Sequence, residues 1–332
     1  MTALPFVSVI IPTYNRGNLL PLTIESFLAQ SYPPDRYEIL ISNNKSTDNT
    51  QILVDQYCKK HPMIKSLYED RQGVHYARNS AAKIARGDIL YFTDDDMVAD
   101  RNLLEELIKV FELDSGIGTA TGLIIGKFDS EPPAWVKKNM SSQLSLTVDW
   151  LTQIDLLVSR GNFDVASCHQ AIRRDAFFEG GGFNPENTAG IWIGDGEVGL
   201  NIRLRKLGYK YAYTSRSVIY HLIPASRTTF RYLLSRVANQ AFSDSCTAYR
   251  EHKNKKMIIP NMVKRTTVLF PTRLVSTTGR VATGKLSWRF IPALLVYYYK
   301  RSIYDWKLYR NEKFRKTVEI DDWLTNEPVI KF

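Results

Sequence analysis

The sequence predicts a doubly wound α/β fold followed by a mainly helical extension. Short apolar, β-branched runs alternate with longer segments in which apolar residues recur at helical spacing, a pattern typical of β-α-β units. The distribution of charged residues also separates the chain into two parts, at about residue 225. Residues 1–225 hold 23 basic and 26 acidic residues, net −3, whereas residues 226–332 hold 21 and 8, net +13. We therefore expect a near-neutral domain over 1–225 and a basic extension over 226–332 that contacts something anionic.

Length and composition are those of a globular protein. The chain has 332 residues, of which 44% are hydrophobic and 23% charged, and a chain of this size can bury a large core. The three cysteines are scattered without a CxxC spacing, so neither a zinc site nor a disulfide framework is indicated. Because no long apolar window and no basic leader segment occur, we expect neither a transmembrane helix nor a signal peptide.

The first part of the chain supplies the predicted β-α-β units. Phe6–Pro12 and Tyr37–Ser42 are runs of the kind that form buried parallel strands, and Asn18–Gln30 between them has helical spacing. A further helix around 77–85 leads into a third apolar strand, Ile89–Thr93. Ligands of such sheets bind beyond the carboxyl ends of the strands, so the residues after each strand are the first candidates for a site.

Three consecutive carboxylates, Asp94, Asp95 and Asp96, follow the third predicted strand. Like charges this close repel one another unless a cation or solvent lies between them. Asp94 and Asp96 point to the same side of an extended backbone and are suited to hold Mg²⁺ or Mn²⁺, with substrate phosphate oxygens completing the shell. The alternative is a solvated turn in which Asp96 caps a helix over 98–113, but the position at a strand end favours the metal.

A second group of unusual residues lies between Gly180 and Arg205. Asp195 and Glu197 stand at the start of an amphipathic helix, where the helix dipole favours ionised carboxylates. One of them is a plausible general base, and simple capping of the helix is the alternative. His221 ends another strand-like stretch; a single histidine there is more often structural than a metal ligand.

Four segments resemble, in order and spacing, the family 2 glycosyltransferases with the GT-A fold: VSVIIPTYNRGNLLPLTIESFLAQSY, ILISNNKSTDNT, GVHYARNSAAKIARGDILYFTDDDM and GGF…GDGEVGLNIRLRKLGYK…VIYH. The resemblance covers residues 6–225. It implies a GT-A catalytic domain with a mixed sheet and a Rossmann-like nucleotide-binding half. It also implies an enzyme that transfers a sugar, such as a hexose, from a nucleotide diphosphate sugar, usually UDP-linked, to an acceptor hydroxyl with inversion. Bacterial-type surface polysaccharide or glycolipid synthesis is the expected setting.

The resemblance further implies roles for individual residues. The triple acid looks like the DxD motif, with Asp94 near the ribose and the metal waters, and with Asp96, or Asp95, on Mn²⁺ or Mg²⁺. His221 matches a family histidine that contacts the metal or the diphosphate. Nucleotide-sugar contacts are implied for Pro12, Tyr14, Arg16, Asn44, Arg78, Asp94 and Asp95.

One departure from the family pattern concerns the nucleotide base. Asn44 stands where the family usually has an Asp that accepts a hydrogen bond from uracil. An Asn still accepts through its carbonyl oxygen, so UDP remains the favoured nucleotide.

The catalytic base is assigned by aligning the helix start. When Leu200 and Arg203 are matched to the family's LxxR, Glu197 occupies the position of the base. Asp195 is then the alternative base or an acceptor-binding group. We expect Trp192 and His169 to contact the acceptor, with a structural role as the alternative for His169.

The basic extension contains two predicted helices, Phe230–Ala248 and Arg289–Tyr309. The second carries FIPALLVYYY between cationic residues, too short to span a bilayer but long enough to lie in its interface. Docking on the catalytic domain or in a homo-oligomer is the alternative. We expect a cytoplasmic enzyme, peripheral on the cytoplasmic face of an anionic membrane, with a glycan or lipid-linked acceptor.

Three other functions compete with a glycosyltransferase. A nucleotidyltransferase shares the fold and an acidic metal site, but its glycine-rich, basic first loop is missing from PTYNRGN. A non-catalytic carbohydrate-binding module is the second. A basic nucleic-acid-binding protein is the third, yet no helix-turn-helix, zinc or RNA-binding signature accompanies the charge, so no nucleic-acid partner is expected.

Overall fold

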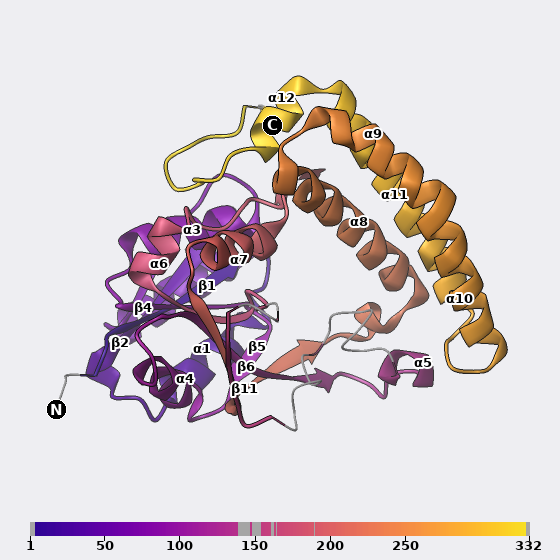
Figure 1. Cartoon of the computed structure of the whole chain (residues 1–332). Coiled ribbons are helices and arrows are strands. Elements are labelled where there is room, and N and C mark those ends of the chain that lie inside the picture. Colours follow the sequence, from indigo (N-terminus) through magenta and orange to yellow (C-terminus); the bar gives the residue numbers. More distant parts are fainter. Residues whose placement is uncertain are drawn as a thin grey trace.

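The structure is a computed structural model that describes residues 4–138, 147, 154–160, 163, 165–188 and 190–329, without the side chains of Thr188, Ile191 and Trp192. An open sheet with helices on both faces forms one part, and a set of long helices stands beside it (Figure 1). The α/β class and the helical extension predicted from the sequence are therefore confirmed.

The main sheet is mixed and has nine strands within the described residues. Its order is β3-β2-β1-β4-β8-β6-β11-β5, and β7 pairs with β11. Strands β1, β2, β3 and β4 are parallel neighbours, β8 runs antiparallel between β4 and β6, and β6 is parallel to β11. The strands are β1 (Val7–Thr13), β2 (Tyr37–Asn43), β3 (Ile64–Tyr68), β4 (Ile89–Thr93), β5 (Met97–Ala99), β6 (Ile117–Phe128), β7 (Leu156–Ser159), β8 (His169–Arg173) and β11 (Lys210–Ile223).

Both faces of this sheet are covered, and every residue of its strands β1, β2 and β4 is buried. In β1, Val9 and Ile11 face one core while Ile10 faces the other, as successive side chains of a strand alternate. The first core is closed by α1 (Leu20–Leu28), α2 (Thr50–Lys60) and α4 (Leu103–Glu112). The second is closed by α3 (Val74–Ile84), α6 (Arg174–Glu179) and α7 (Gly196–Lys206).

Shorter elements complete this part of the chain. The helix anticipated over 98–113 begins later, because residues 97–99 pair with β11 as β5, so Asp96 does not cap a helix. A small hairpin is formed by β9 and β10. The remaining short elements are η1 (Pro34–Arg36), α5 (Ala134–Lys137), β9 (Asn187–Thr188), β10 (Ile191–Trp192) and η2 (Ala225–Thr228).

The extension consists of helices that pack mainly on one another. The two helices predicted there are present as α8 and α11, which pack side by side, with the rings of Phe242 and Tyr304 centred 4.0 Å apart. Figure 1 shows α9, α10 and α11 as an arm leading away from the sheet. No helix among the described residues is long and apolar enough to cross a membrane. The helices are α8 (Phe230–His252), α9 (Lys255–Lys264), a π-helical stretch η3 (Arg265–Leu269), α10 (Phe270–Ala282), α11 (Phe290–Arg310) and α12 (Glu312–Val318).

The last described residues return to the sheet domain. The backbone N–H of Trp323 donates to the carbonyl of Gly181 at 2.9 Å, and Leu324 joins the second core. Glu327 forms an ion pair with Arg71 at 2.6 Å, and Arg71 in turn binds the buried carboxylate of Glu69. The chain end thus clamps the segment that follows β3.

We predict that Gly122→Ala destabilises the protein while Gly279→Ala does not. A Cβ on Gly122 would lie 2.0 Å from the backbone carbonyl oxygen of Ser217, where β11 shifts register against β6. Overpacking against a backbone atom should cost about 1–3 kcal/mol. A Cβ on Gly279 in α10 would have no atom within 4 Å, so alanine there should raise the free energy of unfolding by roughly 0.5–1 kcal/mol. Urea denaturation of both variants measures the difference, and equal midpoints would contradict it.

We also predict a pH-dependent contribution from Glu69. Burial alone would raise the pKa of Glu69, but hydrogen bonds from Arg71 and Ser80 outweigh it and lower the pKa from 4.5 to about 2. A carboxyl with a depressed folded-state pKa stabilises the fold above its unfolded pKa, and this stabilisation is lost as the pH falls toward 2. Glu69→Gln should therefore cost on the order of 2 kcal/mol at pH 7, and the difference from wild type should shrink below pH 4.5.

Thermal unfolding from pH 7 to pH 3 tests this contribution. Glu327→Gln is the matched control, because its carboxylate binds the same Arg71 but is 66% exposed, and exposed ion pairs contribute little. A Glu69→Gln effect that stays constant over this pH range would refute the ionic explanation.

Candidate active site

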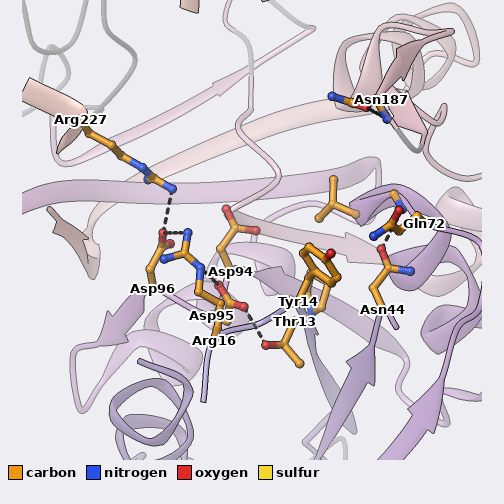
Figure 2. Close-up of a pocket in the computed structure, with 14 residues that line it drawn as sticks. Thr13, Tyr14, Arg16, Asn44, Gln72, Asp94, Asp95, Asp96, Asn187 and Arg227 are labelled. Carbon is orange, nitrogen blue, oxygen red and sulfur yellow. Dashed lines mark hydrogen bonds and ion pairs between the residues drawn. The ribbon is translucent and has the colours of Figure 1, made fainter. Parts of the chain in front are cut away.

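A cavity of about 460 Å³ opens at the carboxyl ends of β1, β2 and β4 (Figure 2). The strand order places these three ends side by side, so residues far apart in the sequence share one wall. Its lining consists of Pro12, Thr13, Tyr14, Arg16, Asn44, Gln72, Gly73, Val74, Asp94, Asp95, Asp96, Asn187, Gly190 and Arg227. The structure therefore brings together the predicted residues that follow the first, second and fourth strands.

Asp94 carries the carboxylate that is most open to the cavity. Its side chain is 35% exposed and forms an ion pair with Arg78, whose side chain is only 2% exposed. Arg78 also donates to the hydroxyl of Ser167 at 2.9 Å. The guanidinium thus stands behind Asp94, in the protein interior, and fixes the orientation of that carboxylate.

Asp95 is directed into the protein. It accepts a hydrogen bond from Thr13 at 2.7 Å, and the Nε of Arg16 lies 3.9 Å away. Burial, and next the charges of Asp96 and Asp94, raise the pKa of Asp95 to about 7 in spite of the Thr13 bond. The Asp95 carboxyl is therefore less readily ionised than an ordinary aspartate, mainly because it is buried.

Asp96 lies beside Arg227 and beside His221, the residue that the resemblance associated with the metal or the diphosphate. Arg227 approaches it at 3.1 Å and the Nε2 of His221 at 3.9 Å. The His221 Nε2 also lies 2.7 Å from Arg227. Figure 2 shows Arg227 reaching across the cavity mouth to Asp96, while Arg16 lies between Asp95 and Asp96.

These residues suit a hard divalent cation only in part. Among the described residues, no group of three or more His, Cys, Asp or Glu side chains is arranged as a complete metal site. Asp94 and Asp96 nevertheless offer oxygen ligands in a region of excess negative charge, with His221 near Asp96. Because Mg²⁺ typically keeps several ligands from water and substrate phosphates, this donor set fits a cation bound together with a diphosphate.

The Asn44 side chain is engaged by the backbone. Its amide donates to the carbonyls of Glu69 and Arg71 at 3.1 and 2.8 Å, and its carbonyl oxygen accepts from the Gly73 N–H at 2.7 Å. Asn44 thus holds the segment that forms the cavity wall at Gln72 and Gly73. Its carbonyl oxygen keeps a second acceptor position.

Glu197 lies in the first turn of α7 with 30% of its side chain exposed, and it faces a histidine that sequence reasoning missed. The Nε2 of His75 is 3.7 Å from Glu197 and 4.0 Å from Glu186. Burial, and then the charge of Arg78, lower the pKa of His75 well below its usual value, so the ring is neutral. Arg78 lies 3.4 Å from the Nδ1 of His75 and can only donate, which leaves the ring proton on Nε2, toward the two carboxylates.

The two carboxylates beside His75 influence each other. Burial, followed by the charge of Glu197, raises the pKa of Glu186. Glu186 therefore holds a proton to higher pH than an ordinary glutamate. A carboxyl whose pKa is raised by burial and a neighbouring acid is common in catalytic sites.

Asp195, the other candidate for the base, is a buried link between domain and extension. Only 1% of this residue is exposed. One carboxylate oxygen accepts from the amide of Asn184, and the other accepts from Thr247 of α8 at 3.0 Å. Arg250 of α8 lies 3.6 Å away. Both oxygens are occupied by protein groups.

The structure describes one of the two residues expected to contact the acceptor, His169, in full, and only the backbone of the other, Trp192. His169 is completely buried in β8, where its ring bonds the Tyr91 hydroxyl at 2.7 Å, and burial lowers its pKa to about 4. Its expected acceptor contact is thus corrected to a structural role, because no part of the side chain reaches solvent. Trp192 belongs to β10, but its side chain lies outside the described part of the structure.

Sequence reasoning missed several cavity and base-site residues. Thr13 and Gln72 carry no unusual spacing, and Glu186 lies in an irregular segment. His75 had a usable signal, since it precedes Arg78 by three residues and so shares its helix face. Arg227 lies 131 positions after Asp96 in the sequence, and only the structure brings the two together.

The chain is similar to known glycosyltransferases over its sheet domain. Glycosyltransferase AglE of Haloferax volcanii is 32% identical over 133 residues, 40% of this chain and 42% of the relative. The glucosyl-dolichyl phosphate glucuronosyltransferase of the same organism is 24% identical over 250 residues, 71% of this chain and 75% of the relative. The chain spans less than half the length of several curated relatives that it matches, AglE among them.

A solved structure shares the fold over nearly the whole chain. A mannosyltransferase from Pyrobaculum calidifontis, solved in complex with GDP-Man and Mn²⁺, superposes with a TM-score of 0.62 at 19% identity, over 92% of this chain and 88% of that chain. This agreement confirms the predicted GT-A fold. The family model described as "Glycosyl transferase family 2" matches residues 8–181, just over half of the sequence, and the chain therefore belongs to glycosyl transferase family 2.

Proposed function

We propose that this glycosyltransferase is a metal-dependent, inverting enzyme that moves a sugar from a UDP-linked donor to an acceptor hydroxyl. One observation carries the proposal: Asp94 is connected through Arg78 and His75 to Glu197. This chain of contacts joins the donor cavity to a partly exposed carboxylate. A donor on one side and an acceptor hydroxyl on the other would then meet between the two groups of acids.

The donor diphosphate is the proposed ligand of the cavity. Arg16 and Arg227 both line it and both lie beside Asp96, and arginine forks suit phosphate oxygens. Tyr14, 45% exposed at the cavity edge, provides a face on which a base can stack. The free acceptor position of the Asn44 carbonyl supports a uracil N3–H contact, as inferred from the family resemblance.

The proposed cofactor is Mn²⁺ or Mg²⁺, held by Asp94 and Asp96 with His221 beside them. A bound divalent cation neutralises charge on the departing diphosphate. Asp95 keeps its bond to Thr13 and remains inside the protein. The solved mannosyltransferase with the same fold contains Mn²⁺, which supports a divalent metal.

Glu197 is the proposed general base, and Asp195 is not, because both oxygens of Asp195 are bonded and buried. Glu197 would take the proton of the acceptor hydroxyl as the oxygen attacks the anomeric carbon opposite the leaving diphosphate. The neutral His75 presents its Nε2–H to the carboxylate and positions it. A single displacement of this kind inverts the anomeric carbon.

The setting that we propose is surface polysaccharide or glycolipid synthesis at the cytoplasmic face of a membrane. Relatives include enzymes whose names contain dolichyl phosphates and poly(ribitol-phosphate), which supports a glycan or lipid-linked acceptor. The net charge of +13 on residues 226–332 supports contact with an anionic surface. Family membership disfavours a nucleotidyltransferase and a nucleic-acid-binding protein, and measured turnover of a nucleotide sugar would exclude a non-catalytic carbohydrate-binding module.

We predict that Glu197→Gln lowers kcat about 10²–10⁴-fold without changing the melting temperature, because general base catalysis contributes in that range. Donor hydrolysis and transfer, followed with a set of UDP-sugars, measure the loss. Glu312→Gln, a fully exposed helix carboxylate far along the chain, is the control and should retain wild-type turnover. Wild-type turnover of Glu197→Gln together with an inactive Glu186→Gln would move the base to Glu186.

We predict that transfer requires a divalent cation and Asp96. EDTA should abolish turnover and Mn²⁺ should restore it, whereas Asp96→Asn should lose most of this recovery. Binding of a ligand to the folded state raises its melting temperature by mass action, so UDP with Mn²⁺ should stabilise the wild type more than GDP with Mn²⁺. Stabilisation by GDP with Mn²⁺ but not by UDP with Mn²⁺ would overturn the uridine assignment. Turnover that persists in EDTA would overturn the proposed metal dependence.

A further inference from the structure

A second cavity, of about 420 Å³, lies between α8, α10 and α11 in the extension, and we call it the arginine groove. Arg236 of α8 and Arg273 and Arg280 of α10 line it. Its other wall is apolar and includes Phe290 and Leu294 of α11. The groove shares no lining residue with the donor cavity, so the donor site does not account for it.

The arginine groove is rich in positive charge. No acid lines the groove, and none of its three arginines forms an ion pair with a carboxylate in the described parts of the chain. Asp244 of α8 is near this wall, but Arg301 holds it at 3.1 Å and the Tyr297 hydroxyl also bonds it. Three cations around one cavity repel one another unless an anion lies between them.

The apolar wall of the groove is built from the protein core. Leu286, Phe290 and Ala293 are 9%, 5% and 2% exposed and pack with Leu233 of α8. The half-buried side chains of Val237 in α8 and Leu294 in α11 also line the groove and give an aliphatic chain apolar surface to cover. An anion alone would need only the arginines, so the combination fits a molecule with a phosphate at one end and an apolar chain behind it.

Exposed apolar side chains also occur on the helices that form the groove and just before α11. Val275 of α10 and Leu295 of α11 are 72% and 47% exposed, and Trp288 before α11 is 55% exposed. Helix α10 has no buried residue, and Figure 1 shows it at the outer edge of the molecule. A chain longer than the groove would thus continue along apolar side chains, where a bilayer can receive it.

One end of the groove lies close to the donor cavity along the chain. Arg236 belongs to the first two turns of α8, which directly follows η2, and Arg227 of η2 lines the donor cavity. The phosphate end of a groove ligand would therefore lie on the side of the catalytic domain.

We propose that the arginine groove binds a lipid phosphate, with the phosphate among Arg236, Arg273 and Arg280 and the chain along Phe290 and Leu294. The acceptor of the sugar would then be lipid-phosphate-linked, an assignment that rests on the proposed function. Binding of the lipid phosphate itself does not depend on transfer.

Titration calorimetry with farnesyl phosphate, below its micelle concentration, tests the site. Arg273→Ala/Arg280→Ala removes two exposed groove cations and should weaken binding at least about tenfold, since charge-assisted bonds to phosphate are lost. Arg231→Ala/Arg310→Ala removes two exposed cations of the same extension outside the groove and should bind as the wild type does. Both variants should keep the wild-type melting temperature.

Several results would overturn the site. Equal weakening in both double variants would make the attraction a general effect of charge. If inorganic phosphate binds as tightly as farnesyl phosphate, the apolar chain contributes nothing to binding. If farnesol binds as tightly, the phosphate contributes nothing. Either result would contradict the proposal. Vesicles of phosphatidylglycerol that bind both double variants equally, with no farnesyl phosphate binding in solution, would make the arm a membrane surface only.

The acceptor assignment has its own readout. Farnesyl phosphate should inhibit transfer by the wild type and not by Arg273→Ala/Arg280→Ala. Unchanged inhibition of that variant would refute the acceptor role. Glu197→Gln should still bind farnesyl phosphate, so failure of the proposed catalysis and failure of the groove give different results.

Discussion

The site depends on the compensation of three adjacent carboxylates at the end of β4. Arg78 comes from α3, Arg16 follows β1, and Arg227 follows β11. These cations reach the acids because β1 lies next to β4 and because β5, just after the acids, pairs with β11. Burial, and next the charges of Asp96 and Asp94, raise the pKa of Asp95 to about 7, and a further cation beside these acids would favour their ionised forms.

The same arrangement determines where acceptor chemistry is placed. Arg78 binds Asp94 on one side and His75 on the other, so the position of the donor carboxylate and the position of Glu197 are linked through one buried side chain. On the far side, Asp195 joins the start of α7 to Thr247 and Arg250 of α8. A buried carboxylate whose partners are removed is strongly destabilising. The extension therefore contributes to holding α7, and with it Glu197, in place.

Much of the sheet domain could be predicted from the sequence, because strand ends and carboxylates are local features. The run Ile89–Thr93 followed by three acids predicted the acidic side of the cavity, at the end of β4, without any distance information. The choice between Asp195 and Glu197 could not be made, since it depends on which way each side chain points at a helix start. The burial of His169 was also beyond prediction, because β8 enters the sheet between two strands that precede it in the sequence. The arginine groove combines α8, α10 and α11, whose contact no spacing in the sequence reveals.

The basic charge of the extension separates into two parts with different roles. Arg250, Arg265 and Arg301 lie inside the helical bundle and are paired with acids at Asp195, Asp305 and Asp244. They stabilise the contact of helices, and a diffuse anionic surface cannot reach them. Within the described residues, the cations of the groove form no ion pair with a carboxylate, and they lie beside an apolar wall that exposed lysines on a solvated face would lack. Three of the 21 basic residues of the extension thus form a built site for an amphiphilic anion, in addition to the structural ion pairs.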